Sequence, residues 1–99
     1  MTADIDDRFY DRADAHIHLV KEHVREIGRG KVSASFMYAA ARFNAWVSAC
    51  GFGSAEEMRT AKDETVEYFV AQHRAMLIQN LDDYSKNFSE YMRPPRCVA

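Results

Sequence analysis

Lys31-Val-Ser-Ala-Ser-Phe-Met-Tyr-Ala-Ala-Ala-Arg-Phe-Asn-Ala-Trp-Val-Ser-Ala-Cys50 is the stretch of sequence that decides the fold. Its side chains are apolar or small nearly all the way round a helix. A helix of this kind belongs in the middle of a bundle, because a surface helix carries a polar face. The stretch therefore predicts a central helix over residues 33–50, with neighbours on more than one side.

Two faces of this predicted helix differ in the size of their side chains. The small face forms an alanine ridge that lets another helix approach closely. Arg42 and Asn44 are the polar misfits of the stretch. The bulky face carries Phe36, Ala39, Ala40, Phe43, Trp46, Val47 and Cys50, and the small face carries Ala34, Tyr38, Ala41, Ala45 and Ala49.

The flanking segments also have helical periodicity, and no alternating strand pattern occurs. Residues 6–27 place apolar side chains three or four apart on one face, and Gly28 is a natural stop. Ser54 and Glu57 form a capping box that begins a third helix over residues 55–92. The sequence predicts one all-α domain over residues 1–99, a small three-helix bundle with a tail at 93–99.

The third predicted helix is too long for its neighbours to cover. If continuous it measures roughly 55 Å, about twice the length of either partner. The helix therefore either kinks and folds back or packs its end on another subunit, since a bare apolar seam is unusual on a soluble monomer. We expect a homo-oligomer, with a dimer favoured. The predicted interface residues are Leu77, Leu81, Tyr84, Phe88 and Tyr91.

Composition excludes several functional classes. Thirteen Lys and Arg against 15 Asp and Glu give a net charge of −2, so nothing draws the chain to nucleic acid or acidic membranes. No apolar run is long enough to span a bilayer. The acidic N-terminus does not resemble a signal peptide, and Cys50 and Cys97 read as free thiols. The expected compartment is the cytoplasm.

Histidines offer candidate sites, each with a structural alternative. His73 lies in the apolar stripe of the third segment, with Asn80 and Asn87 following at heptad spacing. Such a polar row fixes helix register or oligomeric state, and a ligand or proton-transfer role is the alternative. His16 and His23 share one face of the first segment, but no zinc motif is present. No metal site is predicted.

A ligand pocket could form around the polar residues of the central helix. Lys31 lies beside a helix N-terminus, where backbone amides favour anions. Arg42 could pair with an acid of the first segment, reach solvent, or bind a carboxylate or phosphate. The candidate ligand-binding residues are Arg42, Asn44, Tyr38, His73 and Lys31.

Three motifs together carry a resemblance to a known family. They are Phe9-Tyr-Asp-Arg-Ala-Asp14, Gly30-Lys-Val-Ser-Ala-Ser-Phe-Met-Tyr-Ala-Ala-Ala-Arg-Phe-Asn-Ala45 and Met76-Leu-Ile-Gln-Asn-Leu-Asp-Asp-Tyr84. With them the chain resembles a family of short bacterial proteins described only as a domain of unknown function. The resemblance implies a small, cytoplasmic, all-helical bacterial protein, and it brings no activity, cofactor or catalytic residue.

The sequence thus favours a non-enzymatic role. No catalytic or cofactor motif occurs, so no cofactor is predicted. We expect a protein-interaction or oligomerisation module that works as a homodimer or with another protein. The alternative is a small-ligand or anion-binding protein, which could be an enzyme, with its pocket around Arg42, Tyr38 and His73.

Overall fold

The computed structural model describes residues 5–93, and every regular element in that range is an α-helix. The prediction of an all-α fold is therefore confirmed. The helices are α1 (Phe9–Ile27), α2 (Arg29–Cys50), α3 (Ala55–Thr60), α4 (Lys62–Lys86) and α5 (Phe88–Tyr91).

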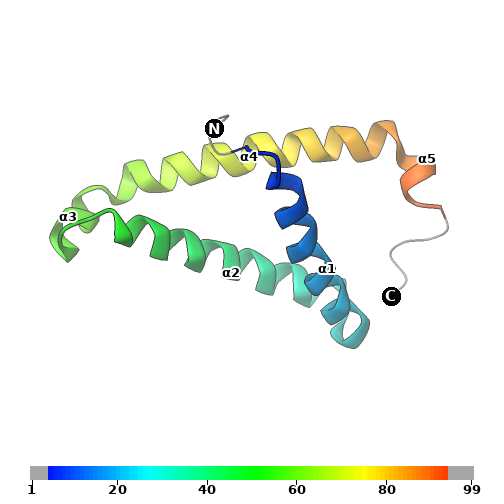
Figure 1. Ribbon diagram of the computed structural model, residues 1–99, viewed down its shortest axis with the longest axis horizontal. Helices are drawn as coiled ribbons and strands as arrows, with labels where there is room; N and C mark the ends of the chain where they lie inside the picture. Colours follow the sequence, from blue (N-terminus) through cyan, green and yellow to red (C-terminus); the bar gives the residue numbers. More distant parts are fainter. Residues whose placement is uncertain (1–4, 94–99) are drawn as a thin grey trace.

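The helices form an open frame. Figure 1 shows α2 and α4 as two long arms joined at one end through α3, with α1 running from α4 toward the start of α2. The molecule measures 51 × 30 × 24 Å. Its radius of gyration of 16.4 Å exceeds the roughly 13 Å of a compact chain of this length. The two arms therefore stand apart instead of packing tightly along their length.

Gly28 alone connects α1 to α2. Its φ of 95° lies in a region that residues with a Cβ rarely adopt. The Gly28 amide donates to the Val24 carbonyl oxygen at 2.9 Å and closes the last turn of α1. Because one residue makes the turn, α2 begins at Arg29 and not at the predicted residue 33. Gly30 and Lys31 lie inside the helix.

The capping box predicted at Ser54 is present. The Glu57 amide donates to the Ser54 hydroxyl oxygen at 3.1 Å, and the Gly53 amide donates to the Glu57 carboxylate at 2.9 Å. These two bonds satisfy backbone donors that a helix N-terminus otherwise leaves unpaired. The third predicted helix accordingly starts at Ala55, as expected.

That third helix is divided at Ala61 and at Asn87, so the predicted span 55–92 becomes α3, α4 and α5. The Thr65 hydroxyl donates to the Ala61 carbonyl oxygen at 2.8 Å, and the Asn87 side-chain amide donates to the Asp83 carbonyl oxygen at 3.0 Å. Side chains that bond to the backbone in this way compete with the helical ladder. Bonds of the same kind, from Ser48 to the Asn44 carbonyl and from Asn80 to the Met76 carbonyl, lie within unbroken helices, so they accompany the two breaks without explaining them.

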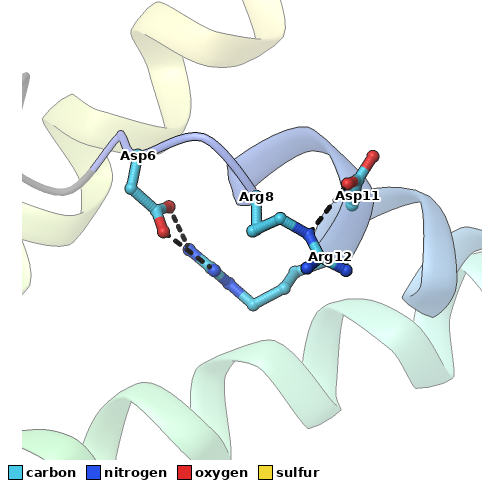
Figure 2. A network of polar contacts seen from close by, with 4 residues as sticks. All are labelled: Asp6, Arg8, Asp11 and Arg12. Atoms are coloured by element: carbon cyan, nitrogen blue, oxygen red, sulfur yellow. Dashed lines mark hydrogen bonds and ion pairs between the residues drawn. The ribbon is translucent and has the colours of Figure 1, made fainter.

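A polar network fixes the chain as it enters α1 (Figure 2). The Arg12 guanidinium donates to the two carboxylate oxygens of Asp6 at 2.7 and 3.3 Å, and Arg8 Nε donates to Asp11 at 3.1 Å. The hydrogen bond from Arg12 lowers the pKa of Asp6 below its ordinary value. All four side chains are exposed, so the network orients the entry to α1 more than it stabilises the fold.

The described chain has almost no core of its own. Val32, near the start of α2, is 5% exposed and is the one buried residue between residues 5 and 93. On α1, the stripe of Phe9, Ala13, Val20 and Val24 is half-buried. Most of the remaining large apolar side chains stay exposed to solvent.

Candidate functional site

The main concave feature of the structure is a groove of about 820 Å³ between α2 and α4, referred to below as the α2/α4 groove. Its lining comes from both arms and from the segment that joins them. The α2 residues are Met37, Ala40, Ala41, Asn44, Ala45 and Ser48; the joining segment gives Phe52 and Met58; α4 gives Lys62, Thr65, Val66, Phe69, Val70, His73, Arg74, Leu77, Ile78 and Leu81.

The α2/α4 groove is predominantly apolar. Lys62 and Arg74 are its charged lining residues, both basic, and no acidic side chain lines it. The Ser48 hydroxyl is already engaged, since it donates to the Asn44 carbonyl oxygen at 2.9 Å. General acid–base chemistry needs titratable groups held within hydrogen-bond reach of one another. No hydrogen bond or ion pair joins two titratable lining residues of the groove.

The face that α2 turns toward the groove includes part of its small face, Ala41 and Ala45, but not Tyr38 or Ala49. Ala41 and Ala45, two members of the predicted alanine ridge, line the groove together with Ala40. Side chains this short leave room for the backbone of another helix to come close. The close approach predicted for the ridge therefore falls inside the groove.

The bulky face of α2 lies on the other side of the helix and is uncovered. Phe43 is two residues from both Ala41 and Ala45, so it points about 160° away from each. Phe43 is 60% exposed and Trp46 is 62% exposed, with their rings 5.7 Å apart. Figure 1 shows α1 beside the first part of α2 only. Beyond that part, large aromatic groups stand in solvent on the face opposite the groove.

The structure brings together only some of the predicted ligand-binding residues. Asn44 and His73 line the α2/α4 groove from opposite arms, whereas Tyr38 and Arg42 lie on a different face of α2. Within residues 5–93, neither Tyr38 nor Arg42 has a hydrogen bond or ion pair, and both are exposed. Lys31 is exposed in the first turn of α2.

The remaining histidines and the predicted interface residues are also placed by the structure. His16 and His23 are exposed on α1. Leu77 and Leu81 line the α2/α4 groove, whereas Tyr84, Phe88 and Tyr91 lie beyond its end. Among residues 5–93, no three His, Cys, Asp or Glu side chains are grouped to hold a metal ion, and no helix is suited in length and apolarity to crossing a membrane.

At the far end of α4, an aromatic and acidic cluster holds α5. The Tyr91 hydroxyl donates to the Asp83 carboxylate, with oxygen–oxygen distances of 3.1 and 3.3 Å. The Tyr84 and Tyr91 rings meet edge to face at 4.9 Å. Phe88, the first residue of α5, nevertheless remains 62% exposed. Within the described residues, α5 is tied to the end of α4 but leaves Phe88 uncovered.

Tyr91→Phe is expected to remove a tyrosine titration that lies above the ordinary pKa of the side chain. The hydrogen bond to Asp83 raises the pKa of Tyr91 above its ordinary value of 10.0. At pH values between the pKa of Tyr91 in the unfolded chain and its higher pKa in the folded chain, the folded chain holds the proton more tightly. The stability that the Tyr91–Asp83 hydrogen bond contributes is therefore lost as the pH rises from the unfolded pKa through the folded pKa. Ultraviolet difference titration of the wild type and the variant tests this. A late phase that persists in Tyr91→Phe would contradict the assignment.

A second cavity of about 600 Å³ lies between the N-terminal end of α1 and α4. Ile5, Phe9 and Tyr10 border one side, and mostly polar residues of α4 border the other. None of the predicted site residues lines it. The two cavities show that α4 is incompletely covered on two faces.

Sequence reasoning did not identify the groove as a site. Ala40 belonged to the predicted bulky face, yet it lines the groove beside Ala41. Met37 and Ser48, also lining residues, were assigned to neither face. The available signal was the apolar character of α2 all the way round, which requires an apolar neighbour on the groove side as well.

Comparison with known proteins places the chain in a family. A family model described as "Protein of unknown function (DUF3144)" matches residues 9–85, which is more than half of the chain, and the chain belongs to this family. No curated protein and no solved structure matches the chain. The matched range runs from the start of α1 almost to the end of α4 and contains the complete lining of the α2/α4 groove.

Proposed function

We propose that this member of the DUF3144 family is a non-enzymatic protein-interaction module, and that the α2/α4 groove is its protein-binding surface. Its working form is a homo-oligomer, with a dimer favoured. Its setting is the cytoplasm of a bacterial cell, as the motif resemblance suggests.

One observation carries the proposal: between residues 5 and 93 the chain buries a single residue, Val32. The chain exposes 8734 Å², whereas a compact protein of 11.4 kDa exposes about 5,800 Å². Hydrophobic burial is the main term that offsets the conformational entropy lost on folding. A helical frame with this little burial needs a partner to supply its core.

The shape of the groove favours a protein over a small molecule. Along α4 the lining extends from Lys62 to Leu81, about 28 Å at 1.5 Å per residue. A small-ligand site closes around most of its ligand and has convergent polar groups that fix its orientation. The volume alone would suit a small ligand. That alternative, however, has only His73 and Asn44 of the predicted residues facing the groove.

The accessibility of a thiol placed in the groove tests the proposal. In a background with Cys50→Ser and Cys97→Ser, the variant Ala41→Cys places a thiol in the groove lining, and Ala49→Cys places one on exposed α2 surface outside it. We expect the thiol at position 41 to react with a maleimide at least about tenfold more slowly, because a bound protein excludes the reagent.

The matched control is the same Ala→Cys change on the same helix. Dilution should speed the reaction at position 41 and leave position 49 unchanged, because dissociation opens the groove. The proposal would be refuted if the thiols at positions 41 and 49 reacted with the maleimide at equal rates at every protein concentration, both in purified protein and in extracts of the cells that make it.

A further inference from the structure

We infer that a second copy of this chain fills the α2/α4 groove, so that α2 of each copy lies between α2 and α4 of the other. The inference rests on the proposed protein-binding role of the groove and names its occupant. Four features support it: the length of the groove, the charge of the helices, the two faces of α2 and the exposed area.

The groove has the length of a helix of this chain. Its α4 wall extends about 28 Å from Lys62 to Leu81. With its 22 residues, α2 is about 33 Å long. An α2 helix laid along the groove would contact both arms over most of its length.

Among the three long helices, α2 is the one with the fewest charges to bury. From Val32 to Cys50 its single charged residue is Arg42. Charged residues recur throughout α1 and α4. Moving a charge into an apolar groove is costly unless the charge is paired, and the groove has no acidic lining residue to pair with Arg42. Because Arg42 lies off the groove-lining face, it can stay at the edge of the assembly.

The two faces of α2 match the two surfaces that it would meet. In a two-fold arrangement the helices follow the order α4, partner α2, α2, partner α4, which is the same from either copy. The groove-lining faces around Ala41 and Ala45 then meet each other, and the short alanine side chains let the two α2 helices pack closely. The bulky face, with Phe43 and Trp46, packs on the apolar stripe of the partner's α4.

The area agrees with an obligate dimer. The chain exposes about 2,900 Å² more than a compact protein of its mass. Obligate homodimers bury about 2,000–5,000 Å² in total, which is about 1,000–2,500 Å² per copy. When α2 of each copy enters the groove of the other, the surface that becomes buried is surface that is apolar and exposed in the single chain.

Disulfide trapping in the full chain tests the arrangement, again with Cys50→Ser and Cys97→Ser. Light scattering should give about twice 11.4 kDa. Either Ala41→Cys or Ala45→Cys should form a disulfide-linked dimer across the two-fold axis, and Ala49→Cys should not. A disulfide through position 49, with none through position 41 or position 45, would overturn the arrangement.

A second measurement uses two differently tagged chains, each with one cysteine. A chain with Phe43→Cys should link to a chain with Val66→Cys, Val70→Cys or Leu77→Cys, all on the groove face of α4. It should not link to Tyr68→Cys, which lies outside the groove. Failure of all three groove pairs would contradict the placement of the bulky face.

Failure of this inference is distinguishable from failure of the proposed function. Suppose that the purified protein is a monomer and that its Ala41→Cys thiol reacts when pure but is protected in an extract of the cells that make the protein. The inference that a second copy fills the groove is then wrong, and the occupant is a different protein. A monomer whose groove thiol is protected when pure, or reactive everywhere, overturns both, because no protein then fills the groove.

Discussion

Val70→Asp is expected to dissociate the protein and to remove its cooperative unfolding, whereas Tyr68→Asp is expected to change both little. Val70 and Tyr68 are each 50% exposed, and both lie on α4. Val70 lines the α2/α4 groove and Tyr68 does not. Comparing the two variants therefore separates the effect of placing a charge inside the groove from the effect of replacing an exposed apolar side chain.

The size of the effect follows from burial in the assembly. A carboxylate enclosed between helices costs several kcal/mol, which an ion pair with Arg74 on the same helix would offset only in part, and a symmetric dimer contains two copies of it. We expect the dimer dissociation constant to rise by at least about 100-fold, equivalent to about 2.7 kcal/mol. Light scattering measures the association and circular dichroism the helicity.

Loss of the dimer should bring loss of the fold, since Val32 is the one buried residue of the described chain. Obligate homodimers often have no stable folded monomer, so their unfolding midpoint depends on concentration. If Val70→Asp instead gave a helical monomer with an unchanged unfolding midpoint, the groove would be an ordinary solvent-exposed surface and the proposed function would fail.

Local signals in the sequence predicted the local structure well. Ser54 and Glu57 form the expected capping box, and Gly28 ends α1 with the positive φ that favours glycine. These features depend on residues close together in the chain, so they can be predicted without knowing the fold. A kink in the third helix was one of the two expected outcomes, but the positions of the breaks at Ala61 and Asn87 were not predicted, because no glycine or proline marks them.

The candidate site depended on contacts that the sequence does not encode locally. Arg42, Tyr38 and His73 were predicted to line one pocket, but the position of α4 relative to α2 decides which of them face each other. The expectation of uncovered apolar surface came from the length of the third segment. In the structure, uncovered surface extends along α2 as well, since α1 lies beside only part of it.

Ala41→Phe gives a test in which the competing explanations predict opposite signs. If two α2 helices meet through their groove-lining faces, a phenyl group at position 41 separates them. Overpacking of this kind costs about 1–3 kcal/mol at each site, and the symmetric dimer carries two such sites. We therefore expect a lower unfolding midpoint and weaker dimerisation.

In an isolated chain with an open groove, the same phenyl group would rest on Val66 and Val70 and bury apolar area that the wild type leaves in solvent. Ala41→Phe would then raise the midpoint. Ala49→Phe is the matched control outside the groove and should change stability by no more than about 0.5 kcal/mol. Thermal unfolding of the three proteins at two concentrations gives the sign. A stabilised Ala41→Phe variant with a concentration-independent midpoint would rule out close packing of α2 against α2.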